Sequence, residues 1–241
     1  MLYAVLSDVH SNLEALEAVL KDVDKKEIGD ILFLGDAVGY GPNPNECVEL
    51  LSERCKILLA GNHDWGSIGL TDIAYFNEDA RNALEWTRSV LTEKNVRKLR
   101  AFPVKKEIQR DGIFLVHSTP KEPEEWHYLF TLWDAEINFQ YFNSRFCFLG
   151  HSHLPFIVEK LPSGELVTYK KEAPIGESER YIVNAGSVGQ PRDGDPRACY
   201  AIINNNKVKL VRVPYDIETV QKKMKREGLP GSLIERLAKG R

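Results

Sequence analysis

The chain has 241 residues, 43% of them hydrophobic and 28% charged, which is typical of a globular protein and not of a disordered one. Its 32 Lys and Arg against 35 Asp and Glu give a net charge of −3, which argues against binding of long nucleic acid and against a polybasic membrane patch. No apolar run approaches the roughly 18 residues of a membrane-spanning helix. The N-terminal run 2–6 is too short for a signal peptide and lacks a basic leader, so we expect a buried strand there.

The first third of the chain alternates apolar strands with amphipathic helices. Strands are predicted at 2–6, 31–34 and 56–60. Ser11 with Glu14 is a capping box that predicts one helix, and Asn43 before Pro44 predicts the start of another. Continuous apolar strands separated by helices are typical of a parallel sheet that is covered on both faces.

The middle of the chain is predicted to form helices at 77–91, 93–102 and 133–142, a hairpin of strands 104–109 and 113–117, and a strand at 146–149. The last third predicts short antiparallel strands at 156–161, 166–169, 181–183, 200–203 and 208–213. Helices follow at 216–226 and from the capping box of Ser232 and Glu235. Without a repeat or a long linker, one domain over residues 1–241 is expected, two sheets deep with helices outside.

The cysteines and histidines differ in their surroundings. The four cysteines lie in apolar segments without C-x-x-C spacing, which predicts buried, reduced thiols in a cytoplasmic protein: Cys47, Cys55, Cys147 and Cys199. Five of the six histidines instead follow predicted strands, beside Gly, Asp, Asn or Ser: His10, His63, His117, His151 and His153. Ligands in α/β proteins bind at the carboxyl ends of strands, so these imidazoles are expected at one edge.

Carboxylates and an amide fall at the same strand ends. The candidate metal ligands are Asp8, His10, Asp36, Asn62, His117, His151 and His153. Imidazole, carboxylate and amide donors without thiolate favour Mn, Fe, Zn, Co or Ni over Mg or Ca. Seven side chains exceed what one ion needs while keeping an open position, so the count predicts two divalent transition-metal ions that share a carboxylate.

The pattern D-x-H, GD, GNHD, H and GHSH over residues 8–153 resembles the calcineurin-like metallophosphoesterase superfamily. The stretches Gly39–Pro44 and Asn184–Arg192 are similar to its small prokaryotic branch of YfcE-type and diadenosine-tetraphosphatase-like proteins. The resemblance implies an α/β fold, a four-layer α/β/β/α sandwich of two mixed sheets flanked by helices. That architecture agrees with the element order predicted above.

The resemblance also implies roles for individual residues. One metal would take Asp8, His10, Asp36 and His153, and the other Asp36, Asn62, His117 and His151, with Asp36 bridging and Mn or Fe favoured. His63 matches the family's histidine that contacts the scissile phosphate and protonates the leaving oxygen. Asp64 is expected to orient that imidazole. The implied nucleophile is a metal-bridging hydroxide, as in two-metal hydrolysis, and not a serine.

Other residues keep two interpretations each. Arg192 and Arg197 either bind substrate phosphate or form a surface ion-pair cluster with Asp193 and Asp195. Tyr40 and Asn43 either line the substrate pocket or anchor a turn. His127 belongs to no motif and is expected to be a structural or rim residue.

The sequence therefore predicts a metal-dependent phosphoric ester hydrolase, a phosphodiesterase or phosphatase. Its expected substrate is a small phosphodiester or nucleotide-type ester, with no long nucleic acid or membrane as partner. A homo-oligomer is compatible with the sequence. The alternative is a non-catalytic metal-binding scaffold of the same fold, against which the intact ligand set and His63 argue.

Overall fold

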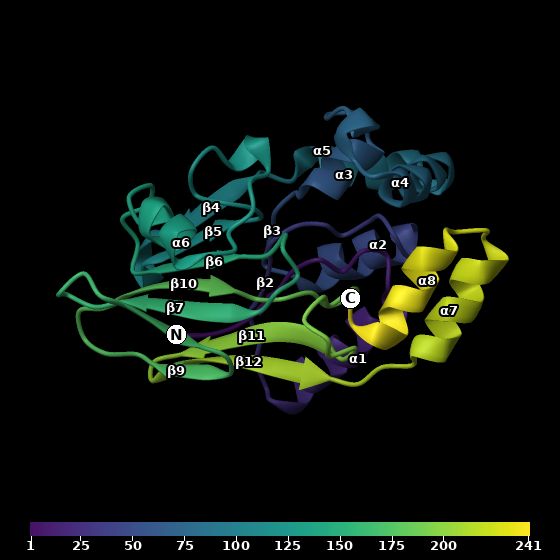
Figure 1. Cartoon of the computed structure of the whole chain (residues 1–241). Coiled ribbons are helices and arrows are strands. Elements are labelled where there is room, and N and C mark those ends of the chain that lie inside the picture. The colour runs from purple at the N-terminus through teal and green to yellow at the C-terminus, as the bar shows by residue number, and fades with distance from the viewer.

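Two six-stranded mixed sheets face each other in the computed structural model, which describes residues 1–241, and helices cover the outer faces of both sheets (Figure 1). The first sheet has the order β3-β2-β1-β11-β12-β9. Its strands are β3 (Ile57–Leu58), β2 (Ile31–Phe33), β1 (Leu2–Leu6), β11 (Ala198–Asn204), β12 (Lys207–Val213) and β9 (Glu172–Pro174). Strands β1, β2 and β3 run parallel, and the other neighbours pair antiparallel.

The second sheet has the order β4-β5-β6-β10-β7-β8. Its strands are β4 (Lys105–Ile108), β5 (Ile113–Val116), β6 (Phe146–Leu149), β10 (Arg180–Asn184), β7 (Phe156–Lys160) and β8 (Leu166–Tyr169). Strands β5, β6 and β10 run parallel, so their carboxyl ends meet at one edge, as those of β1, β2 and β3 do in the first sheet.

The alternation of side chains along the central strands builds the layers. Tyr3 and Val5 of β1 face the core between the sheets, together with Phe146 and Phe148 of β6. The intervening residues of β1 pack under α1 (Leu13–Lys25) and α2 (Pro44–Arg54), and those of β6 pack under α6 (Leu132–Asn138). Because successive residues of a strand point to opposite faces, one apolar run supplies two cores. The four-layer α/β/β/α sandwich is thus confirmed.

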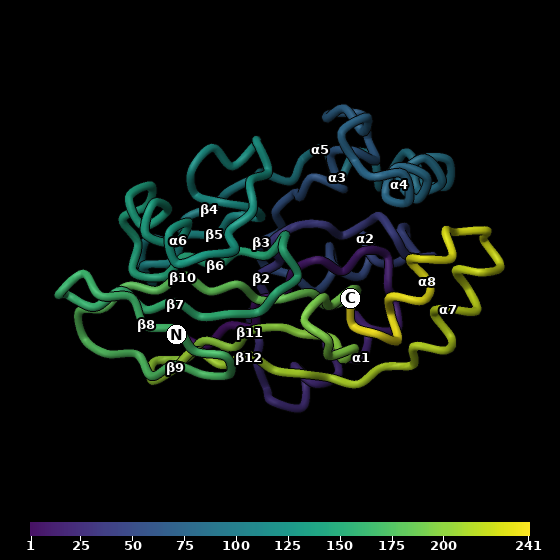
Figure 2. Tube along the Cα trace, in the orientation of Figure 1, coloured from purple at the N-terminus to yellow at the C-terminus, as the bar shows by residue number.

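The remaining helices lie beside the sandwich. Helices α3 (Asn62–Ser67), α4 (Glu78–Val90) and α5 (Glu93–Ala101) follow β3, and α7 (Ile217–Arg226) and α8 (Gly231–Lys239) follow β12. Apolar residues of α4, α7 and α8 share a small core with Tyr40. Figure 2 shows the chain end returning toward the middle of the fold, where the amide of Gly194 donates to the carbonyl of Gly240 at 2.8 Å.

Most predicted elements are present, and the differences lie at caps and short segments. Asn12, and not Ser11, caps α1, because its side chain accepts from the amide of Ala15 while Ser11 is left-handed at φ 57°. The Ser232 capping box is wrong, since α8 begins after Pro230 without a side-chain cap. Strand β9 and helix α3 were not predicted. All four cysteines are free and buried, as expected. Every helix is too short or too polar to span a bilayer.

Candidate metal centre

The predicted donor residues lie together just beyond the carboxyl ends of five strands. Asp8 and His10 follow β1, Asp36 follows β2, and Asn62 follows β3 from the first sheet; His117 follows β5, and His151 and His153 follow β6 from the second. All of them are buried. Three groups offer ligand atoms within 4.8 Å of one another: Asp8, His10 and His153; Asp36, His117 and His151; and His10, Asp36 and His63.

The backbone at this edge is held in unusual conformations. Ten residues other than glycine have positive φ, and six of them are predicted site residues: Asp8, His10, Asp36, Tyr40, His151 and His153. Left-handed backbone is costly for residues with a Cβ and persists where the surroundings fix it, often at functional sites. The loop 184–190 helps to hold the backbone of Asp8, because the amide of Gly189 and the hydroxyl of Ser187 both donate hydrogen bonds to the carbonyl of Asp8.

Each of the four histidines among the candidate ligands has one ring nitrogen within hydrogen-bond distance of a backbone carbonyl. The pairs are His10 Nδ1 with Val38 at 3.2 Å, His117 Nδ1 with Leu34 at 3.2 Å, His153 Nδ1 with Gln190 at 2.6 Å and His151 Nε2 with Trp126 at 2.8 Å. A carbonyl only accepts, so that nitrogen carries the proton in the neutral ring. The other nitrogen then presents a lone pair, the form that binds metal.

The lone pairs and carboxylate oxygens converge on one another. His10 Nε2 lies 3.0 Å from His153 Nε2, and His153 Nε2 lies 3.2 Å from Asp8 Oδ1. His117 Nε2 lies 3.3 Å from Asp36 Oδ2. Three of the buried donor atoms, Asp8 Oδ1, Asn62 Oδ1 and His117 Nε2, have no hydrogen-bond partner. Buried polar atoms rarely stay unpaired, so this donor set fits divalent transition-metal cations.

The electrostatics of the site also favour a cation. Burial opposes ionisation of Asp8 and Asp36, but the surrounding histidines outweigh it and hold the pKa of both carboxyls below the ordinary value. Burial lowers the pKa of His151 to about 3 and that of His153 to about 4. At His117 the charges of Asp36 and Asp8 overcome burial and raise the pKa to about 9. Anionic carboxylates among mostly neutral imidazoles leave buried negative charge, which a divalent cation offsets.

Asp64 has partners that differ from the expected one. Its carboxylate accepts from the amides of Asp36 at 2.9 Å, Gly61 at 3.0 Å and Val38 at 3.2 Å, and no hydrogen bond joins it to the ring of His63. The expectation that it orients the imidazole through a hydrogen bond is therefore wrong for this structure. Burial and the charge of Asp36 raise the pKa of Asp64 to about 7. Through these hydrogen bonds, Asp64 connects the loop that carries Asp36 to the start of α3.

His63 lies in the first turn of α3, beside the donor cluster. Its amide donates to Asp36 Oδ1 at 2.9 Å, and its ring packs against Tyr40 at 4.4 Å and Phe76 at 5.1 Å between centroids. Its Nδ1 has no hydrogen-bond partner, and burial lowers its pKa well below the ordinary value. His63 and Asn62 line a cavity of about 520 Å³ that opens beside the centre. His63 is therefore positioned to contact a bound molecule.

The four predicted substrate residues have different surroundings in the structure. Arg192 Nη2 donates to Tyr40 Oη at 3.2 Å and to Gln190 Oε1 at 3.1 Å, and its buried Nε has no partner. Tyr40 lines the cavity and also packs in the small core that it shares with α4, α7 and α8. Asn43 instead pairs with Glu46 and Lys223.

Two further residues lie on the protein surface. Arg197 forms an exposed ion pair with Asp195 at 2.6 Å, which matches the ion-pair interpretation. His127 is exposed at the rim, 3.6 Å from Glu122, as expected of a residue outside the motifs. The sequence reasoning missed the residues whose carbonyls orient the rings, such as Gln190 and Trp126, because a backbone acceptor carries no residue-type signal.

The chain is similar to known phosphoesterases in sequence and in fold. Residues 1–207 match the family model described as calcineurin-like phosphoesterase superfamily domain. The chain is 41% identical over 242 residues to an uncharacterized protein from Methanocaldococcus jannaschii, over 99% of this chain and 98% of the relative. A metallophosphoesterase from Sphaerobacter thermophilus matches at 41% identity and a TM-score of 0.87, covering 100% of this chain and 99% of its own. Yfce, a phosphoesterase from E. coli, matches at 22% identity and a TM-score of 0.47 over 85% and 89% of the two chains.

Proposed function

This chain belongs to the calcineurin-like phosphoesterase superfamily, and from that premise we propose that it hydrolyses a small phosphate ester with two divalent transition-metal cations at the strand ends. The observation that carries the proposal is the convergence of buried donor atoms without partners beside a cavity lined by His63. A non-catalytic scaffold of this fold would have no use for that cavity and histidine. The conclusion is a phosphoric ester hydrolase.

The three groups of donors support an assignment of ligands. We assign Asp8, His10, Asp36 and His153 to one cation, and Asp36, Asn62, His117 and His151 to the other, with Mn or Fe favoured. Asp36 belongs to a donor group on each side, which supports its role as the bridge. When bound, such a pair of cations lowers the pKa of a coordinated water and offsets charge on phosphoryl oxygens.

The hydrolysis forms one P–O bond from the water oxygen and breaks the P–O bond to the organic group. The leaving oxygen must gain a proton, and His63 is the side chain at the cavity with a free ring nitrogen. The negative charge of a bound phosphate favours the protonated imidazole, and in that form His63 holds an N–H toward the leaving oxygen and supplies the proton as the bond breaks. Asp64 supports this step indirectly, because it fixes the backbone at both Asp36 and Gly61.

Arg192 supplies a fixed positive charge near the reacting phosphate. Its Nε is buried and unpaired, while Tyr40 and Gln190 hold its Nη2, so the planar fork is oriented before a ligand binds. Phosphate binding by Arg192 therefore raises substrate affinity. The exposed ion pair of Arg197 with Asp195 supports a structural role for that second arginine.

We propose that residues 1–241 act as one domain, because α7 and α8 beyond the matched residues share a core with Tyr40 and α4. The four buried, unpaired thiols support a reducing compartment, the cytoplasm. The net charge of −3 supports a small substrate over a long nucleic acid.

The test replaces His63 by alanine and uses His127→Ala as the matched control. His63→Ala is expected to lower kcat about 100- to 10,000-fold, the usual share of a general acid, while the metal content per chain stays unchanged. The exposed His127→Ala variant should match the wild type in both measurements. Full turnover in His63→Ala would refute its role as the acid, and loss of metal would make it a ligand.

A further inference from the structure

The cavity beside the centre has walls from two segments outside the metal motifs. One wall comes from the approach to α4 and its first turns, and the other from residues 124–128 before α6. The lining residues are Tyr40, Asn62, His63, Thr71, Asp72, Tyr75, Phe76, Asn77, Ala80, Glu124, Glu125, Trp126, Tyr128 and His151. Because His63 faces the leaving oxygen under the proposed function, the group that occupies this cavity is the leaving group.

The charge of the walls has one sign. The lining contains three carboxylates, Asp72, Glu124 and Glu125, and neither lysine nor arginine. None of the three carboxylates has an ion-pair partner, and only Asp72 accepts a hydrogen bond, from the amide of Ala74. Their negative charge is therefore not offset by a neighbouring side chain and acts on a ligand that fills the cavity. Asn62 and His63, which the proposed function places at the reacting phosphate, also line this cavity, so a ligand that fills it lies beside that phosphate.

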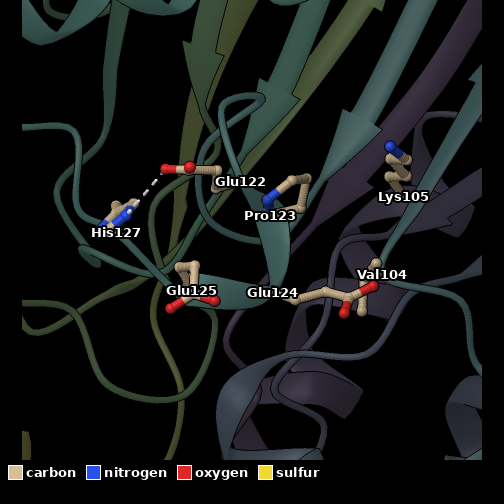
Figure 3. Close-up of a pocket in the computed structure, with 7 residues that line it drawn as sticks. All are labelled: Val104, Lys105, Glu122, Pro123, Glu124, Glu125 and His127. Carbon is tan, nitrogen blue, oxygen red and sulfur yellow. Dashed lines mark ion pairs between the residues drawn. The ribbon is translucent and has the colours of Figure 1, made fainter.

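Glu124 and Glu125 lie on a short turn that is hydrogen-bonded to the candidate metal centre. The 3-10 turn Pro123–Glu125 lies between two left-handed residues, Glu122 at φ 49° and Trp126 at φ 55°. The carbonyl of Trp126 accepts from His151 Nε2 at 2.8 Å. Figure 3 shows a second hollow that Glu124 and Glu125 line as well, together with Lys105 and with Glu122, whose carboxylate lies 3.6 Å from His127. The backbone that carries the two carboxylates therefore keeps a defined place beside the candidate metal centre.

Aromatic rings complete the walls. Tyr40, Tyr75, Phe76, Trp126 and Tyr128 all line the cavity, and Tyr75 is 92% exposed, so its face is free for a ligand. Aromatic faces attract organic cations, and nearby carboxylates strengthen that attraction. A polyphosphate would instead bring further negative charge against three carboxylates, with no cation in the lining to receive it.

We propose that the cavity selects a phosphate ester with a single phosphoryl group and a positively charged organic leaving group. The inference rests on the proposed function and extends it to the substrate class. Water adds to phosphorus, the P–O bond to the cationic group breaks, and that group departs as its protonated alcohol or phenol. Asp72, Glu124 and Glu125 are specificity residues, because they attract the leaving group and take no part in bond making.

The experiment uses aryl phosphates, as monoesters and methyl diesters, whose ring carries a trimethylammonium, a tert-butyl or a carboxylate group at the meta position. Metal-loaded wild type is compared with the triple variant Asp72→Asn, Glu124→Gln, Glu125→Gln. The readout is the ratio of kcat/KM for the ammonium ester to that for its uncharged tert-butyl isostere. Comparing this ratio between proteins cancels the intrinsic reactivity of each leaving group.

Each neutralised carboxylate is expected to lower the ratio about two- to fivefold, and the triple variant about 10- to 100-fold. Glu122→Gln is the matched control, since Glu122 lies on the same turn but outside the cavity, and its ratio should equal that of the wild type. An unchanged ratio in the triple variant, or a dinucleoside tetraphosphate cleaved as well as the ammonium ester, would overturn the inference alone. If the wild type cleaves none of these esters, the proposed function is overturned as well.

Discussion

Gly39 offers a way to move His63 without changing any candidate ligand. Gly39 has φ +94°, and a Cβ built on it would lie 2.5 Å from His63 Nδ1 and 3.1 Å from its Cγ. Ordinary contacts begin near 3.5 Å, so Gly39→Ala must displace the imidazole by about 1 Å. A misplacement of about 1 Å at a reacting group costs about 100-fold in rate. We therefore expect kcat to fall about 100-fold while metal content is retained.

The backbone cost of this substitution needs its own control. Gly164 has φ +91° in the turn between β7 and β8, and nothing lies within 4 Å of a Cβ there. Alanine costs about 1–2 kcal/mol for the left-handed backbone at either position, and at Gly39 the displaced ring adds about 1–3 kcal/mol, so thermal unfolding should show Gly39→Ala to be less stable than Gly164→Ala but folded. Only Gly39→Ala should lose turnover with 4-nitrophenyl phosphate esters. Equal turnover in the two variants would refute the placement of His63 at the reacting phosphate.

The two arginines and the metal give the remaining predictions. Arg192→Gln should raise KM about 10- to 100-fold, because a charge-assisted contact to phosphate contributes about 1.5–3 kcal/mol. Arg197→Gln should leave KM unchanged, and equal effects of the two substitutions in steady-state kinetics would contradict the different roles of these residues. Removal of metal by a chelator should lower Tm by about 5–10 °C, since a ligand at 100 times its Kd stabilises a fold by about 2.7 kcal/mol. Addition of metal should restore the original Tm. An unchanged Tm in calorimetry would count against the metal site.

The strand ends could be predicted from the sequence because their signal is local. Apolar runs such as Ile31–Leu34 stop at Gly35 and Asp36, and the carboxyl ends of parallel strands share an edge, so the meeting of distant donors follows from topology. The outer layers followed likewise from periodicity. Asn12 lies next to the predicted cap Ser11, and only the conformation of the chain decides which of the two polar residues caps α1.

Other features depend on tertiary contacts that leave no local trace. Asp64 stands beside His63 in sequence, yet its carboxylate turns to the amides of Asp36, Val38 and Gly61, because helix α3 starts at this point. The cavity walls come from residues 71–80 and 124–128, which carry no recognisable motif. The residues that line the cavity were therefore harder to predict than the candidate metal ligands.

The central claim is that the buried donors at the strand ends hold a pair of cations through the shared carboxylate of Asp36. Elemental analysis of the purified wild type and of Asp36→Ala tests it directly. The account predicts about two transition-metal ions per chain in the wild type and loss of both in the variant, because both sites share that ligand. A fully active wild type with a single ion, or an Asp36→Ala variant that retains both ions, would contradict it.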